Sequence, residues 1–168
     1  MPKAVRFTRY GGPEVLEIAE VARPRAGQGQ VVVEVVAAAL NPGEIGIREG
    51  VFAAVWPAHF PEGQGNDFAG HVAEVGNDVE EFTAGDRVLG FAPRAAQAEF
   101  VVVDPDALTP MPAGLGWAEA ASIAGAGATA WAGVEAVARG RARRSSCPRP
   151  RAGSASSPPS SRSCAVPP

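Results

Sequence analysis

The side chains that could do chemistry in residues 1–138 are amides, carboxylates and imidazoles, and none of them is a thiol. Both cysteines, Cys147 and Cys164, lie beyond residue 139. This excludes a disulfide framework and a thiolate metal site from residues 1–138. Asp67 alone would hold a metal only weakly, because no thiolate or imidazole ligand accompanies it. We therefore expect chemistry without a bound metal.

Asn41 is the most suggestive of the polar residues, because it follows the long apolar run "VVVEVVAAAL". Its carboxamide could bind a substrate or a cofactor. An Asn-Pro pair also commonly ends a strand, so Asn41-Pro42 could be purely structural, and both roles stay open. His71 falls in an alternating pattern, which favours a structural role on a strand face. His59 lies in an aromatic loop and is a candidate for lining a pocket.

Short strands are the elements that must position these residues. Alternating or β-branched patterns predict strands over 3–10, 15–21, 31–40, 68–76, 86–91 and 98–103. Residues 43–50 fit one or two helical turns, and 51–65 form an aperiodic loop. Residues 117–138 are rich in alanine and predict two helical stretches separated by "GAGAT". This order indicates a mainly β fold, a small barrel or closed sheet, followed by one or two helices.

The charge of the chain changes near residue 139. Residues 1–138 hold eight basic residues and all 18 acidic ones, a formal charge of −10, whereas residues 139–168 hold seven arginines and no acid. An acidic body repels a polyanion and the basic end lacks aromatic side chains, so we expect no nucleic-acid partner. No apolar run has membrane-spanning length and the N-terminus has no signal-type segment, which predicts a cytoplasmic protein without a membrane partner.

Four stretches, in order and with the spacing of a known family, carry a resemblance. They are "MPKAVRFTRYGGPEVLEI", "VAAALNPGEIGIREG", "GNDFAGHVAEVGNDVEEFTAGDRVLGF" and "AEAASIAGAGATAWAGV". Together they resemble the medium-chain dehydrogenase/reductase superfamily, and within it the zinc-independent quinone oxidoreductases. The resemblance implies a GroES-like β-barrel catalytic domain over residues 1–116. It also implies helices over 117–138 that lead into a Rossmann domain, with NADPH as the cofactor.

Zinc independence follows from a comparison with the zinc-dependent alcohol dehydrogenases of the same superfamily. Those enzymes place a Cys where this chain has Asn41-Pro42, and a His-Glu pair where it has Asn66-Asp67. They also insert a lobe with four cysteines, whereas residues 80–103 contain none. The resemblance therefore implies a hydride transfer that needs no metal.

The resemblance implies hydride transfer from NADPH to a quinone or an activated enone, with site residues to match. It assigns Asn41 to the floor of the cleft, as a catalytic donor to the acceptor oxygen or a contact to the nicotinamide. Thr129, in "GATAW", corresponds to a position whose hydroxyl approaches the nicotinamide–ribose end, unless it bonds only to its own helix backbone. Phe52, Trp56 and Phe60 would form the acceptor-side wall, or pack as core residues.

The same residues are compatible with other functions. An enoyl-thioester reductase would use the same hydride step on another small-molecule substrate, and a stand-alone GroES-like domain could be a non-catalytic binding module. The family is often homodimeric. An apolar face on 117–138 with Trp117, Ile123 and Trp131 would be exposed without a second domain, which predicts poor solubility or self-association.

Residues 139–168 predict a disordered tail, because they offer almost nothing apolar to bury. A basic arm or a linker fits the rest of the chain less well. Back-translated and read in a shifted frame, residues 145–166 can encode "VVLPAAAGGVGVVAAQLAVLRG", a strand, a glycine-rich turn and a helix start. We therefore hypothesise that a frameshift has replaced the dinucleotide-binding motif, which would leave the chain as given inactive. Resequencing the gene across this junction tests the hypothesis.

Overall fold

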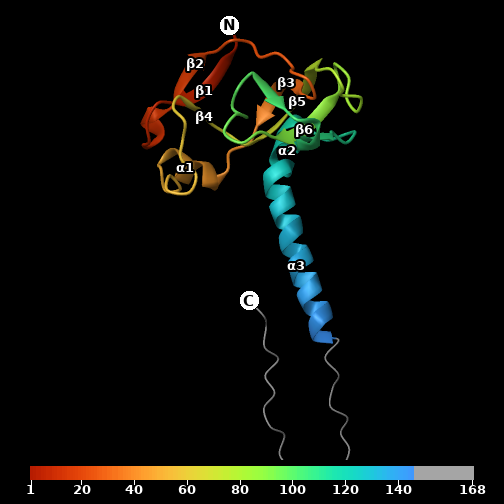
Figure 1. Cartoon of the computed structure of the whole chain (residues 1–168). Coiled ribbons are helices and arrows are strands. Elements are labelled where there is room, and N and C mark those ends of the chain that lie inside the picture. The colour runs from red at the N-terminus through yellow and green to blue at the C-terminus, as the bar shows by residue number, and fades with distance from the viewer. Residues whose placement is uncertain (146–168) are drawn as a thin grey trace, which may run out of the picture. The chain divides into compact units, whose positions relative to one another are not determined.

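The computed structural model describes residues 1–145, with side chains up to Arg139 (Figure 1). Residues Met1–Gly133 form one compact unit, and those from Val134 onward belong to a second. The strands are β1 (Lys3–Phe7), β2 (Glu17–Glu20), β3 (Val31–Ala38), β4 (Glu62–Gly63), β5 (Asp67–Val75), β6 (Arg87–Phe91), β7 (Phe100–Val103) and β8 (Leu108–Pro110). The helices are α1 (Pro42–Arg48), α2 (Trp117–Ser122) and α3 (Ala128–Ser145), with the π-helical segment η3 (Ile123–Gly127) and the 3₁₀ turns η1 (Pro13–Val15) and η2 (Pro105–Ala107).

Two antiparallel sheets make up most of the first unit (Figure 1). One has the order β2-β1-β4 and the other β7-β3-β5-β6-β8. An isolated bridge between Ala4 and Ala98 joins them, together with a backbone bond of 2.8 Å from Val5 N to Gln97 O. The predicted mainly β fold is confirmed.

The core lies against β3, which pairs with β7 on one side and β5 on the other in the larger sheet. Val31, Val32 and Val33 are at most 1% exposed, and β-branched side chains of this kind pack well on a pleated surface. Phe68 on β5 is also fully buried in the same cluster as Val31 and Val33. Full burial of each such side chain contributes about 1.5–3 kcal/mol. This packing fixes the ends of β3 and β5, and those ends hold the polar residues of interest.

A second cluster fastens α2 to the larger sheet. Ala120 and Ala121 are buried against Ala69 of β5 and Leu89 of β6, and these small side chains let the helix approach closely. Trp117 packs against this cluster, so the prediction that it would be exposed is wrong. Its ring also lies edge-on to His71.

The helical region differs from its sequence prediction in one respect. The predicted interruption at "GAGAT" is absent, because α2 continues through η3 into α3. Small residues allow this wider π turn, and a Cβ at Gly125 would lie only 2.6 Å from Oδ2 of Asp67. Ile123 and Trp131 are exposed as expected, with 41% and 69% of their surfaces accessible.

The helix α3 extends to Ser145, past the predicted end at 138. The remainder of the predicted disordered tail, with its frameshift hypothesis, lies outside the described residues. Within the described part, no helix is both long and apolar enough to cross a membrane.

Candidate active site

A pocket of about 570 Å³ lies where three parts of the first unit meet. Asn41 and the first residues of α1 form one side, Asp67 at the start of β5 and Phe91 at the end of β6 form another, and Gly125 and Thr129 close it from η3 and α3. The register of the sheet places Asp67 opposite Phe91. Asn41 and Thr129, which lie far apart in the sequence, therefore line one pocket.

The shortest side-chain hydrogen bond in this pocket joins Asn41 to Asp67. Nδ2 of Asn41 donates to Oδ2 of Asp67 over 2.6 Å, and Asp67 is fully buried. The other carboxylate oxygen, Oδ1, is buried without a hydrogen-bond partner, and Gly125 packs directly against the carboxylate. A hydrogen bond to a buried charge is stronger than one between neutral groups, so Asp67 holds the Asn41 carboxamide firmly.

Glu44 of α1 is a second buried carboxylate beside Asn41. It is 3% exposed and accepts long hydrogen bonds from Nδ2 of Asn41 and of Asn66, both 3.4 Å, and from Nε2 of Gln97, 3.5 Å. Burial raises the pKa of Glu44 above its ordinary value, and the charge of Asp67 adds to this effect, while hydrogen bonds from Asn41 and Asn66 oppose it. The described residues offer neither carboxylate a salt bridge.

These contacts define what the Asn41 side chain can still do. A carboxamide has two N–H donors, and here they face Oδ2 of Asp67 and Oε1 of Glu44. Both partner oxygens belong to carboxylates, which accept hydrogen bonds and donate none. The amide nitrogen of Asn41, rather than its amide oxygen, therefore faces them. The carbonyl Oδ1 has no hydrogen bond to a described residue, so it is the free atom of this side chain and an acceptor.

Thr129 makes the hydrogen bond to its own helix backbone that the sequence suggested as its alternative role. Its Oγ1 donates to the backbone oxygen of Gly125 over 2.8 Å, as threonines often do within helices. The hydroxyl oxygen can still accept a hydrogen bond. Thr129 also lines the pocket, so the hydrogen bond within the helix is compatible with a contact to a ligand there.

The three predicted wall residues lie outside the lining of this pocket. Phe60 stacks edge-on to Tyr10 at 5.0 Å, Trp56 lies 4.1 Å beneath the Arg94 guanidinium, and Phe52 sits against Gly46 of α1. Each is partly exposed, with 43% to 48% of its surface accessible. Their role as a substrate wall stays a prediction.

The two histidines do not line the pocket either. His71 on β5 has Nδ1 3.4 Å from the backbone oxygen of Gly85, which agrees with a structural role. The backbone N–H of His59 donates to Glu62 over 3.0 Å in the loop before β4. Among the described residues, no three His, Cys, Asp or Glu side chains are grouped closely enough to hold a metal ion.

Sequence reasoning missed Glu44 and assigned Asp67 only a weak metal-binding capacity. One signal was available for Asp67, since an acidic residue starts a strand whose next residues are apolar. No comparable signal marked Glu44, because an acidic residue in the first turn of a helix is usually exposed and favourable there.

Comparison with known proteins places this geometry in a family. The profile of the alcohol dehydrogenase GroES-like domain matches residues 27–130, from the loop before β3 to the start of α3. The chain belongs to this family. The GroES-like domain here is that of the medium-chain dehydrogenase/reductase superfamily, in its quinone oxidoreductase-like branch.

Solved quinone oxidoreductases have the same fold. The enzyme from Coxiella burnetii matches with a TM-score of 0.73 and 32% identity over 80% of this chain and 44% of that one. The Escherichia coli quinone oxidoreductase complexed with NADPH matches with a TM-score of 0.67 and 30% identity, over 71% of this chain and 36% of that one.

The GroES-like chain is also similar to a much larger protein. It is 37% identical over 132 residues to the phthioceranic/hydroxyphthioceranic acid synthase of Mycobacterium tuberculosis, which covers 79% of this chain and 6% of the synthase. The chain thus spans less than half of each of these relatives.

Proposed function

We propose that this domain contributes active-site residues to a zinc-independent reductase that transfers hydride from NADPH to a quinone or an enone. The observation that carries the proposal is the presence of Asn41 and Thr129 in a single pocket. The likeness to the quinone oxidoreductases of Coxiella burnetii and Escherichia coli supports the reaction class. NADPH, when bound, would supply the hydride.

The pocket suits the nicotinamide end of this cofactor. Gly125, Ala126 and Ala130 keep one wall low, which leaves room for a flat ring. The free Oδ1 of Asn41 and the Thr129 hydroxyl offer uncharged acceptors to a carboxamide and a ribose. We assign these residues to cofactor contact.

The role of Asn41 then follows from its partners. With both N–H groups engaged by Asp67 and Glu44, the side chain positions a carbonyl oxygen rather than donating to an oxyanion. The two carboxylates act as positioning residues, because they fix the direction of the carboxamide. A quinone or an enone accepts hydride without a Lewis acid, and water or a neutral donor can supply the proton for the acceptor oxygen.

Phe52, Trp56 and Phe60 complete the proposal as the acceptor wall. Their partly exposed aromatic side chains lie on the loop after α1, and α1 itself begins at the pocket. Offset stacking on such rings would hold a planar quinone.

An enoyl thioester is the second candidate acceptor. The solved CurK enoyl reductase, which has the same fold, supports this candidate, because an enoyl reductase uses the same hydride step. Initial rates with a panel of naphthoquinones, enones and enoyl thioesters would distinguish the two candidates.

Binding of reduced nicotinamide mononucleotide to the isotopically labelled chain tests the assignment of the pocket. We expect amide shifts in NMR spectra to be confined to residues near Asn41, Asp67 and Thr129. Ala130→Leu, which fills the pocket, should weaken binding at least tenfold. Ala132→Leu is the matched control, because Ala132 is also an exposed alanine of α3 but does not line the pocket.

Titration with NADPH, followed by cofactor fluorescence, extends this test to the whole cofactor. Shifts at other residues, or equal binding by the two leucine variants, would rule out this site. Binding without NADPH oxidation in the presence of a naphthoquinone would instead favour a binding module over an enzyme.

A further inference from the structure

Buried polar atoms without a partner direct attention to a second cavity. Among the described residues, three side-chain atoms are buried without a hydrogen-bond partner: Oδ1 of Asp67 and the Nε atoms of Arg6 and Arg94. Asp67 belongs to the pocket described above, and both arginines line another cavity of about 420 Å³. None of its lining residues lines the Asn41 pocket.

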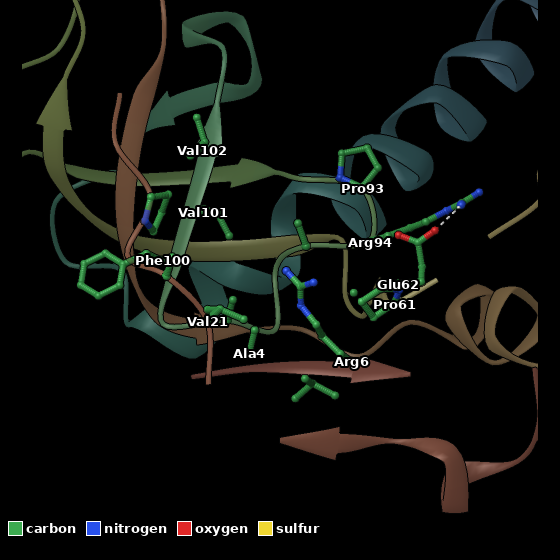
Figure 2. A pocket seen from close by; sticks show the side chains of 16 residues that line it. Ala4, Arg6, Val21, Pro61, Glu62, Pro93, Arg94, Phe100, Val101 and Val102 are labelled. Carbon is green, nitrogen blue, oxygen red and sulfur yellow. Dashed lines mark hydrogen bonds and ion pairs between the residues drawn. The ribbon is translucent and has the colours of Figure 1, made fainter. Parts of the chain in front are cut away.

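This cavity lies between the two sheets (Figure 2). Arg6 projects into it from β1, and Phe100, Val101 and Val102 of β7 lie on the opposite side, as Figure 2 shows. Prolines contribute to other parts of the wall, among them Pro61 and Pro93. Apart from the charged groups of Arg6, Arg94 and Glu62, the side chains around the cavity are thus largely apolar.

Arg94 is held in place by several partners. Its Nη1 donates to Oε2 of Glu62 and to the backbone oxygen of Pro57, both over 2.9 Å, and its Nη2 donates to the backbone oxygen of Trp56 over 3.2 Å. Its side chain is 9% exposed and stacks on the Trp56 ring. The charges of Glu62 and Arg94 therefore neutralise one another, and Figure 2 shows this ion pair at one side of the cavity.

Arg6 has no comparable partner. No described residue forms a salt bridge or a side-chain hydrogen bond with its guanidinium, and its Nε is buried. A guanidinium keeps its charge and carries five N–H donors arranged to match a carboxylate. Leaving a buried donor unsatisfied costs about 1–3 kcal/mol, which an anionic ligand would recover.

We infer that this cavity binds a small organic monoanion, a carboxylate on an apolar body, with the carboxylate on Arg6. The charges lining the cavity are two arginines and one glutamate, which leaves one positive charge for the ligand. Glu62 repels a second negative charge, so a carboxylate fits better than a phosphate dianion. The apolar walls accept a short alkyl or aryl group, and the volume is in the range of small-molecule sites.

Calorimetric titration of the full chain with hexanoate, at low ionic strength, tests the inference. We expect saturable binding with one site per chain. Hexanamide, which has the same shape without the charge, should bind at least tenfold more weakly, and so should inorganic phosphate. Equal binding of hexanamide would show that the cavity recognises only the apolar group, and would refute the role of Arg6. Tighter binding of phosphate would refute the carboxylate assignment.

Two substitutions link the binding to this cavity. Arg6→Met keeps the length of the side chain and removes its charge, and should weaken hexanoate binding at least tenfold. Arg9→Met is the matched control, because Arg9 is exposed and does not line the cavity. Ala22→Trp fills the cavity from its rim, and should abolish binding without touching Arg6.

Circular dichroism and thermal melting confirm that each variant is folded. If Arg6→Met does not fold, Ala22→Trp carries the test. The inference fails if hexanoate binds the folded Ala22→Trp variant normally, if Arg9→Met weakens binding as much as Arg6→Met, or if the unmodified chain shows no saturable binding.

Discussion

Nδ2 of Asn41 lies 2.6 Å from Oδ2 of Asp67, and this hydrogen bond joins the chain just after β3 to the first residue of β5. The bond satisfies one oxygen of a fully buried carboxylate, while the other oxygen has no partner. A side chain that is usually read as a strand terminator is therefore also the main support of a buried charge.

A double-mutant cycle measures this support. Asn41→Ala leaves the Asp67 charge buried without its short hydrogen bond, and should cost about 3 kcal/mol in the free energy of unfolding. Asp67→Asn removes the charge at constant shape, and should change stability by less than about 1 kcal/mol. Chemical denaturation of both single variants and of the double variant gives the coupling energy.

The double variant should recover most of the loss caused by Asn41→Ala, because the unsupported charge is gone. A double variant as unstable as the sum of the single variants would show that the two side chains act independently. Two denaturant titrations per variant, followed by circular dichroism, give unfolding free energies precise enough to distinguish these two outcomes.

Glu44 gives the fold a dependence on pH. Burial raises the pKa of Glu44 in the folded protein, so the folded state favours the protonated carboxyl. The stability that this preference contributes is complete below the ordinary pKa of glutamate and is lost as the pH rises through the raised pKa. Glu44→Gln should therefore raise the melting temperature relative to the unmodified chain, and more so at pH 8 than at pH 4.

Glu17→Gln is the control for this measurement, because Glu17 is exposed on β2. A melting-temperature difference for Glu44→Gln that is constant from acidic to alkaline pH would contradict the raised pKa.

Gly125 should not tolerate a side chain. A Cβ at this position would lie 2.6 Å and 2.7 Å from the two carboxylate oxygens of Asp67, and a buried carboxylate has little freedom to move. Gly125→Ala should cost about 1–3 kcal/mol. Gly133→Ala meets no atom within 4 Å, and should stabilise α3 by up to about 1 kcal/mol, since alanine favours helices. Thermal melting of both variants checks the contrast, and an equal effect would disprove it.

Exposed apolar side chains on α3 should make the chain self-associate. Trp131, Val134 and Val137 expose 69%, 64% and 60% of their surfaces. Replacing all three with glutamine should lower the apparent mass at high concentration in sedimentation experiments. Val55→Gln is the control, because Val55 is 91% exposed on a loop. A monomer at all concentrations for the unmodified chain would contradict this prediction.

The strands with a clear alternating or β-branched pattern were predictable, and the short ones were not. β3 was predicted from its β-branched run, which suits a buried strand, and β5 from the strand pattern of residues 68–76. β4 comprises only Glu62–Gly63 within an aperiodic loop, and β8 ends in Pro110 within a proline-rich segment. Such elements form through contacts with distant strands, which local pattern does not report.

The candidate site was predictable in part, and mostly through family resemblance. Asn41 and Thr129 were named from motifs, but nothing local indicated that their side chains line the same pocket. The burial of Glu44 depends on Asn66 and Gln97, which come from distant parts of the chain. The engagement of both Asn41 N–H groups likewise required three-dimensional contacts.

The π-helical segment η3 sets the direction in which Thr129 points. A π turn contains one residue more than an α turn, and each residue of a helix rotates the next by about 100°. Deleting a single residue from Ile123–Gly127 would thus leave the α2 alanines seated on the sheet while swinging the threonine hydroxyl away from Asn41. The number of residues in η3 therefore sets how the Asn41 side and the Thr129 side of this pocket face each other. An insertion or a deletion in η3 can change this alignment where a point substitution cannot.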